Sequence, residues 1–238
     1  MYKRATRLAG KLLNDSPLRL APFRLFYFGS VGVALGYTMQ ATVAAWLMAT
    51  LTPSALMVAL VQTASTAPSL LLGLAAGALA DIVDKRRIIL VTQIVLIATT
   101  TALGALTLFG LTGPLVLLAL TFLIGAAFTF YMPAQQASVN DLVARTEVPR
   151  AVALNAVAFN LARAGGPAIA GVVAAWLSTG SAMLLSGGFF IAMVVAIRRM
   201  KRAGPTLRGV PETIRSGIQS GLRFTRHSPP MRALLIRN

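Results

Sequence analysis

Arg163 is the only charged residue between positions 151 and 197, and a cation in such apolar surroundings needs a partner. If this stretch crosses a membrane, burying the guanidinium costs at least about 2.5–3.5 kcal/mol. Asn160 lies three residues earlier, so a helix places both side chains on one face. We therefore predict that Asn160 and Arg163 line a cavity and bind an anionic or carbonyl-rich ligand. The alternative is that Arg163 only hydrogen-bonds backbone carbonyls or reaches toward an interface.

The sequence has few residues of the types needed for metal binding or catalysis. The sequence has no cysteine, and its single histidine, His227, lies in the charged C-terminal tail. Three long stretches, 25–80, 88–140 and 151–197, contain no aspartate or glutamate. The chain therefore offers no metal-ligating cluster and no catalytic constellation within them. We expect no enzymatic activity, no metal site and no cofactor.

The composition indicates that water is not the main solvent of this chain. Hydrophobic residues make up 56% of the 238 residues, charged residues only 12%, and the mean hydropathy is +0.74. An average soluble chain carries about 25% charged residues. Each of these three stretches is long enough for two membrane spans of about 20 residues, and a turn divides it near the middle. The predicted fold is an all-α membrane protein with helices at 25–49, 55–80, 88–109, 114–138, 151–177 and 181–198.

The basic residues predict the orientation of these helices. The net charge is +16, and apart from Arg163 the cations lie in the first 24 residues, at 85–87, at Arg145 and Arg150, and from Arg198 onward. The intervening connections near 51, 111 and 179 carry no charge. By the positive-inside rule, both termini are cytoplasmic. Basic groups that flank apolar runs fit a lipid bilayer as the partner, and we expect no nucleic acid to bind.

The chain divides into four predicted segments. Residues 1–24 form a basic cytoplasmic leader, and residues 25–198 form the six-helix bundle. Residues 199–230 form a cytoplasmic linker that includes an amphipathic helix, although a solvated basic segment is the alternative. Residues 231–238 read as the start of a truncated seventh helix, since they contain no cap or stop signal.

Residues 77–87, GALADIVDKRR, resemble the loop signature of the major facilitator superfamily. In that family the loop between helices two and three latches two halves of the transporter shut on the cytoplasmic side. Ile82 stands where a basic residue is usual, and Asp84 stands where a glycine is usual. The alternative is a plain cytoplasmic turn. The resemblance predicts a gating loop built from Gly73, Gly77, Asp81, Asp84, Lys85, Arg86 and Arg87.

Residues 162–171, ARAGGPAIAG, resemble a second signature, which marks antiporting exporters in the same superfamily. Proline removes a backbone donor and glycine removes bulk, so Gly166, Pro167 and Gly171 are expected to bend and pack this helix. Ala162 replaces the leading glycine of the signature. The alternative is ordinary packing of small residues.

Residues 131–140, YMPAQQASVN, are similar to a segment of the bacterial subfamily that contains siderophore and macrolide exporters. This resemblance implies a bacterial inner membrane protein and half of a twelve-helix fold, built from two inverted three-helix repeats. It also implies a second six-helix half as partner, either the rest of the chain or a homodimer mate. Helices one and four line the cavity in this family, which makes Gln40 a further cavity candidate, against a helix–helix hydrogen bond.

Together these features predict a secondary active transporter that exports small amphipathic molecules by alternating access. No phosphate-binding loop of the Gly-x-x-x-x-Gly-Lys-Ser/Thr type occurs, so we expect an ion gradient, rather than nucleotide hydrolysis, to supply the energy for transport. The alternatives are an importer of the same superfamily and a membrane scaffold or sensor that transports nothing.

Overall fold

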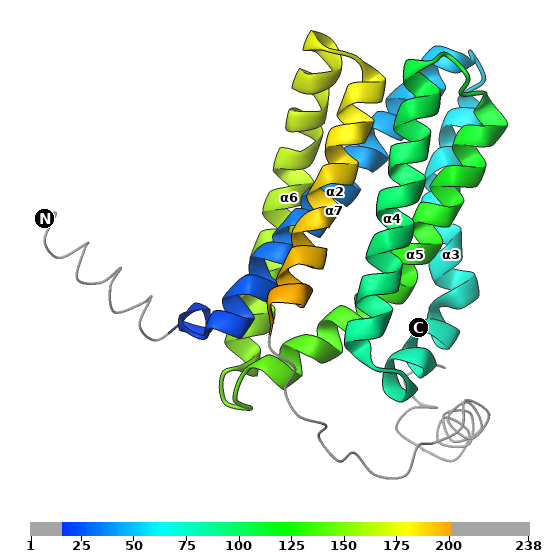
Figure 1. Cartoon of the computed structure of the whole chain (residues 1–238). Coiled ribbons are helices and arrows are strands. Elements are labelled where there is room, and N and C mark those ends of the chain that lie inside the picture. The colour runs from blue at the N-terminus through cyan, green and yellow to red at the C-terminus, as the bar shows by residue number, and fades with distance from the viewer. Residues whose placement is uncertain (1–15, 201–238) are drawn as a thin grey trace, which may run out of the picture.

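The computed structural model describes residues 16–200, which form a bundle of long helices (Figure 1). The segments predicted as an amphipathic helix and as the start of a seventh helix lie outside the described residues. Within residues 16–200, six helices are long and apolar enough to cross a membrane, as predicted. They are α2 (Ala21–Leu51), α3 (Ala55–Ile82), α4 (Lys85–Leu108), α5 (Pro114–Leu142), α6 (Val148–Trp176) and α7 (Thr179–Arg199).

The helix boundaries follow from local sequence. A short 3-10 turn, η1 (Pro17–Arg19), precedes α2, which begins four residues before the predicted span, so Arg24 lies in its first turn. Ser54 and Ser178 each cap the following helix by accepting a hydrogen bond from a backbone N–H. Gly110, two residues after the end of α4, has a φ of 69°, a backbone angle that favours glycine.

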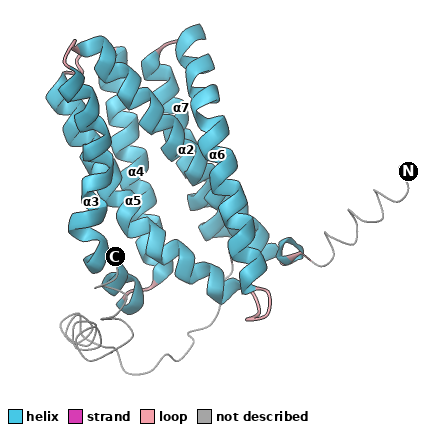
Figure 2. Ribbon diagram, turned by 180° about the vertical axis from the view of Figure 1, so that it is seen from behind, coloured by secondary structure: helices cyan, strands magenta, loops and turns pink. Residues whose placement is uncertain are grey.

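The six helices form two intertwined sets of three. The first set is α2 to α4 and the second is α5 to α7. Consecutive helices are antiparallel and each set has three of them, so the second set starts at the opposite end of the bundle and is inverted relative to the first. The sets exchange contacts: α2 packs mainly on α6 and α7, whereas α5 packs mainly on α3 and α4. Figures 1 and 2 show α3 and α6 at opposite edges of the bundle. This pattern is that of one half of a major facilitator fold.

Glycines allow the helices of the two sets to cross closely. A Cβ added at Gly36 of α2 would lie 2.7 Å from the carbonyl oxygen of Ser186 in α7. One added at Gly125 of α5 would lie 2.5 Å from the carbonyl oxygen of Ser65 in α3. Both distances are shorter than real Cβ contacts, so any side chain at these positions would push the helices apart.

The two ends of the bundle differ in charge. The connections Thr52–Ser54, Phe109–Gly113 and Leu177–Ser178 lie together at one end, which we call the uncharged end. The connections at 83–84 and 143–147 lie at the other, which we call the basic end because Lys85, Arg86, Arg87, Arg145 and Arg150 are found there. These two ends serve as reference points for the position of each site residue along its helix.

Candidate functional site

A cleft opens between α2, α5 and α6 in the half of the bundle nearest the basic end. Its volume is about 400 Å³, which lies within the range of small-molecule sites. Polar groups enter it from all three helices, Ser30 from α2, Gln135 from α5 and Asn155 from α6. Among the described residues, no charged side chain lines it. The cleft is therefore amphipathic rather than ionic.

The Gln135 amide connects the three helices at the cleft. Its Nε2 donates to Ser30 Oγ at 3.3 Å and lies 3.5 Å from Asn155 Oδ1. Asn155 Nδ2 in turn donates to the carbonyl oxygen of Ala151, 3.2 Å away. Among residues 16–200, the Gln135 carbonyl oxygen accepts no hydrogen bond. Gln135 is buried and lines the cleft, so leaving this oxygen unpaired costs free energy that a polar group entering the cleft would recover.

Aromatic rings form the side of the cleft toward the middle of the bundle. Phe128, which lines the cleft, stacks on Tyr37 with ring centroids 3.8 Å apart and an angle of 11° between planes. Tyr131, which is buried, packs beside Phe128 at 5.8 Å. The stack joins α2 to α5, which otherwise touch little. A molecule in the cleft thus meets amides on one side and ring faces on another.

The helix segment with the antiporter-like signature lies against α2. Gly166 of α6 is buried, and a Cβ added there would lie 2.1 Å from Thr38 Oγ1. Thr38 Oγ1 is also 3.0 Å from the carbonyl oxygen of Ala162, one of three carbonyls within its reach. Helix α6 continues through Pro167 without interruption. At Gly171 an added Cβ would meet nothing within 4 Å, so this glycine faces away from the bundle.

Arg163 and Asn160 lie on the open side of α6. Both are exposed, and Asn160 Nδ2 donates to the carbonyl oxygen of Ala156 in its own helix. Arg163 follows the cleft residue Phe159 by four positions, so it continues the cleft face of α6 one turn toward the uncharged end. Arg163 has no hydrogen bond or ion pair with another residue of 16–200. The guanidinium is therefore accessible at mid-helix.

Gln40 lies apart from the cleft. It is 1% exposed and is not among the residues that line the cleft. Its Nε2 has no hydrogen-bond partner within the described part of the chain. The structure therefore does not bring Gln40 together with Asn160 and Arg163, and its role in a cavity stays a prediction.

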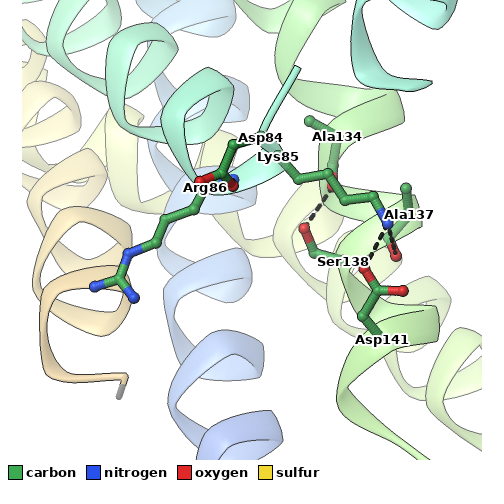
Figure 3. Close-up of polar contacts among 7 residues, drawn as sticks. All are labelled: Asp84, Lys85, Arg86, Ala134, Ala137, Ser138 and Asp141. Atoms are coloured by element: carbon green, nitrogen blue, oxygen red, sulfur yellow. Dashed lines mark hydrogen bonds and ion pairs between the residues drawn. The ribbon is translucent and has the colours of Figure 1, made fainter. Parts of the chain in front are cut away.

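The predicted gating loop joins helix ends through Lys85. Its Nζ lies 2.5 Å from Asp141 Oδ2 and donates to the carbonyl oxygen of Ala137 at 3.1 Å, as Figure 3 shows. The Lys85 side chain is only 14% exposed. These contacts hold the start of α4 against the end of α5.

The neighbouring residues of the loop have other partners. Arg86 extends away from Lys85 in Figure 3, and its Nη1 donates to the carbonyl oxygen of Met200 at the end of α7. The Asp84 carboxylate accepts from the Arg86 backbone N–H at 2.9 Å and caps α4. Its φ is −53°, so this turn does not use the left-handed geometry for which a glycine would be needed.

Three further residues of the predicted gating loop, Asp81, Gly73 and Gly77, face outward, whereas Arg87 lines a second cavity described below. Asp81 is exposed and forms no hydrogen bond or ion pair with another described residue. Added Cβ atoms at Gly73 and Gly77 would meet nothing within 4 Å. These three positions are four residues apart, so they form one open stripe along α3.

Sequence reasoning did not select the residues that form the cleft itself. Ser30, Gln135 and Asn155 are 20 or more residues apart in the chain and meet only through the crossing of α2, α5 and α6. One signal pointed to them: Gln135 and Asn155 are rare amides within otherwise apolar spans. Polarity alone did not reveal which rare amides share a cleft.

Comparison with known proteins gives the chain its relatives. It is 30% identical over 223 residues to the multidrug efflux pump Tap of Mycolicibacterium fortuitum. The matched region covers 90% of this chain and 54% of the relative. It is also 30% identical over 154 residues to the staphyloferrin A transporter of Staphylococcus aureus. This second matched region covers 64% of this chain and 39% of the relative. The chain thus spans about half the length of these relatives or less.

A family assignment agrees with the fold. Residues 14–238 match the transmembrane secretion effector family, and the six apolar helices and their inverted packing fit its superfamily. The chain therefore belongs to the transmembrane secretion effector family of the major facilitator superfamily.

Proposed function

We propose that this chain forms one half of a secondary active transporter that exports small amphipathic compounds by alternating access. The observation that carries this proposal is the cleft between α2, α5 and α6, where the Gln135 amide lies near the Tyr37–Phe128 stack with no charged residue in the lining. Such a surface suits molecules that combine apolar bulk with a few hydrogen-bonding groups. Sugars need many convergent polar groups, and this cleft offers few.

The relatives support the substrate class. One is named a multidrug efflux pump and the other a transporter of staphyloferrin A. We propose that this chain handles compounds of the drug or siderophore type, in a bacterial inner membrane, with its basic end in the cytoplasm. In that orientation the cleft between α2, α5 and α6 lies on the side from which an exporter collects its substrate.

A second six-helix half is the proposed partner of the open faces of α3 and α6. On α3, Leu70 and Leu74 are 88% and 90% exposed beside the empty stripe of Gly73 and Gly77. On α6, Gly171 is equally free of neighbours. Stripes of small residues allow another helix to approach closely in a membrane. The second half would be further chain or, less favoured, a second copy of this one.

The exposed Asp81 gives the proposed latch its charge. Lys85 and Arg86 are already engaged within the bundle, whereas the Asp81 carboxylate has no partner among the described residues and is available to a second half. A carboxylate at this position would be stabilised by the positive end of a helix in the second half. Breaking that contact would open the basic end.

Arg163 supplies a charge beside the proposed substrate path. It continues the cleft face of α6 and has no partner within residues 16–200, so an anionic substrate group would offset the cost of a cation in the membrane. In this proposal, anionic compounds pass close to Arg163, whereas neutral ones depend on the cleft alone.

An efflux assay tests the proposal. The longest reading frame that contains this chain is expressed in a strain that lacks major efflux pumps, and accumulation of siderophores and macrolides is measured. We expect reduced accumulation, and we expect Gln135→Ala to abolish most of the reduction. Ser138→Ala is the matched control, because Ser138 lies one turn along α5 and its hydroxyl donates only to the carbonyl oxygen of Ala134.

The outcomes separate the alternatives. Increased accumulation would identify an importer, and no effect on any compound would favour a scaffold or sensor. Residues 1–238 alone are expected not to complete a cycle, because they provide one wall of the path. Equal transport by residues 1–238 alone and by a version carrying a second half would point instead to a homodimer.

A further inference from the structure

A second cavity, distinct from the cleft, runs between α3, α4 and α5 near the basic end. Its volume is about 400 Å³, and its lining is apolar except for Thr92 and Arg87. Along α4 the lining extends from Arg87 to Val95, eight residues or about 12 Å. Val91 and Leu123, on facing helices, are 53% and 45% exposed, so the groove is open along its length. We call it the α4 groove.

Arg87 differs from its two basic neighbours in having no partner among the residues that the structure describes. Lys85 is paired with Asp141, and Arg86 binds the carbonyl oxygen of Met200. Within residues 16–200, Arg87 forms neither a hydrogen bond nor an ion pair. Asp84 lies three residues before it, but the Asp84 carboxylate accepts from the Arg86 backbone N–H. A free guanidinium thus lies at the end of an apolar groove.

The α4 groove lies on the opposite side of α3 from the surface proposed for the second half. Leu79 and Val83 contribute to the groove, whereas Gly77 and Asp81 belong to the open stripe. Residues two apart on a helix point about 200° away from each other, since each residue turns the helix by about 100°. A second half seated on the stripe would therefore leave the groove facing lipid.

We propose that the α4 groove binds one anionic phospholipid, with the headgroup phosphate on Arg87 and an acyl chain along α4 and α5. The charge and the shape argue for the same occupant. A guanidinium binds phosphate through charge-assisted hydrogen bonds, and the apolar lining matches a hydrocarbon chain. Arg87 lies in the first turn of α4, at the level where the headgroups of that leaflet lie. A soluble anion would leave the apolar length of the groove unfilled.

This proposal rests on the proposed function in one respect, that a second half seated on the stripe leaves the groove facing lipid, and its test measures lipid binding rather than transport. Its test uses the whole chain reconstituted in phosphatidylcholine vesicles. Trp46 and Trp176 are replaced by phenylalanine, and Phe130→Trp places one fluorescent reporter in the groove. Phosphatidylglycerol or phosphatidylcholine with brominated acyl chains then quenches the reporter on contact. We expect the anionic lipid to be preferred by about fivefold, the effect of one arginine near a membrane surface.

Variants distinguish the site from general attraction to a basic surface. Arg87→Gln should remove the preference, and Arg87→Lys should keep most of it, which also controls for folding. Arg145→Gln, an equal loss of charge at the basic end but outside the groove, should leave it unchanged. Leu123→Trp provides a second reporter if Phe130→Trp fails to fold. Equal loss in Arg87→Gln and Arg145→Gln, or no preference at either reporter, would overturn the proposal.

Discussion

At the scale of single residues, Gly166 allows α6 to lie close against Thr38 of α2. No side chain larger than hydrogen fits between α6 and α2 at this point, because the Thr38 hydroxyl already occupies the space. Gly171, in the same helix, has no such neighbour. The two glycines of one sequence signature therefore serve different surfaces.

We predict that Gly166→Ala destabilises the bundle by about 1–3 kcal/mol, the usual effect of overpacking. The matched control, Gly171→Ala, should be neutral or stabilising, since alanine is the better helix former by about 1 kcal/mol. Thermal unfolding in detergent would measure both. Because Thr38→Ala removes the clashing hydroxyl, it should recover part of the loss. A Gly171→Ala variant as unstable as Gly166→Ala would contradict this assignment of faces.

A second prediction concerns Arg163. In the complete transporter, Arg163→Ala should lower efflux of anionic compounds by about tenfold or more, since a hydrogen bond to a charged group contributes roughly 1.5–3 kcal/mol. Arg163→Lys keeps the charge but loses the planar fork, so an intermediate rate is expected. Neutral compounds serve as the control in the same accumulation assay. Undiminished efflux of both classes in Arg163→Ala would remove Arg163 from the path.

At the scale of elements, the loop between α3 and α4 combines an internal and an external function. Lys85 and Arg86 fasten the start of α4 to the ends of α5 and α7. Asp81 faces outward, without a partner among the described residues. The same short loop thus stabilises the bundle and, in the proposed function, presents a charge to a second half.

These two functions predict opposite results for two substitutions. Lys85→Gln should lower the stability of the isolated chain by about 1 kcal/mol, because it breaks a partly buried ion pair with Asp141. Asp81→Asn should leave that stability unchanged yet reduce transport by the complete protein. Unfolding temperature and efflux rate, measured on both variants, test the division. Loss of stability in Asp81→Asn would show that Asp81 has a partner inside this half.

The elements were largely predictable, whereas the site was not. Runs of apolar residues and breaks such as Pro53, Gly113 and Ser178 indicate six helices, because a bilayer demands long uninterrupted apolar segments. The Gln135–Ser30 contact depends on how α2 and α5 cross in the folded bundle, which periodicity within one helix does not encode. Gln40 is an example: its polarity within an apolar span suggested a cavity residue, but it is buried and is not among the residues that line the cleft.

At the scale of the whole molecule, the separation of charge between the two ends predicts the topology. The chain has no cysteine, so single cysteines can be introduced without background. Thr52→Cys, Leu111→Cys and Thr179→Cys should react with an impermeant maleimide on intact cells. Ala144→Cys, an exposed position at the basic end, should react only after the membrane is opened. Labelling of Ala144→Cys alone on intact cells would invert the orientation.

The exchange of contacts between the two sets of helices also bears on how the protein is made. The ribosome delivers α2, α3 and α4 to the membrane before α5 exists, yet α5 is the main neighbour of α3, which touches α2 and α4 only slightly. Until α5 emerges, the nascent α3 has lipid rather than protein along most of its length. The interval of translation between residues 82 and 142 is then the period in which membrane proteases and chaperones compete for this helix. Codons that slow elongation there would lower the yield of protein without changing a single residue.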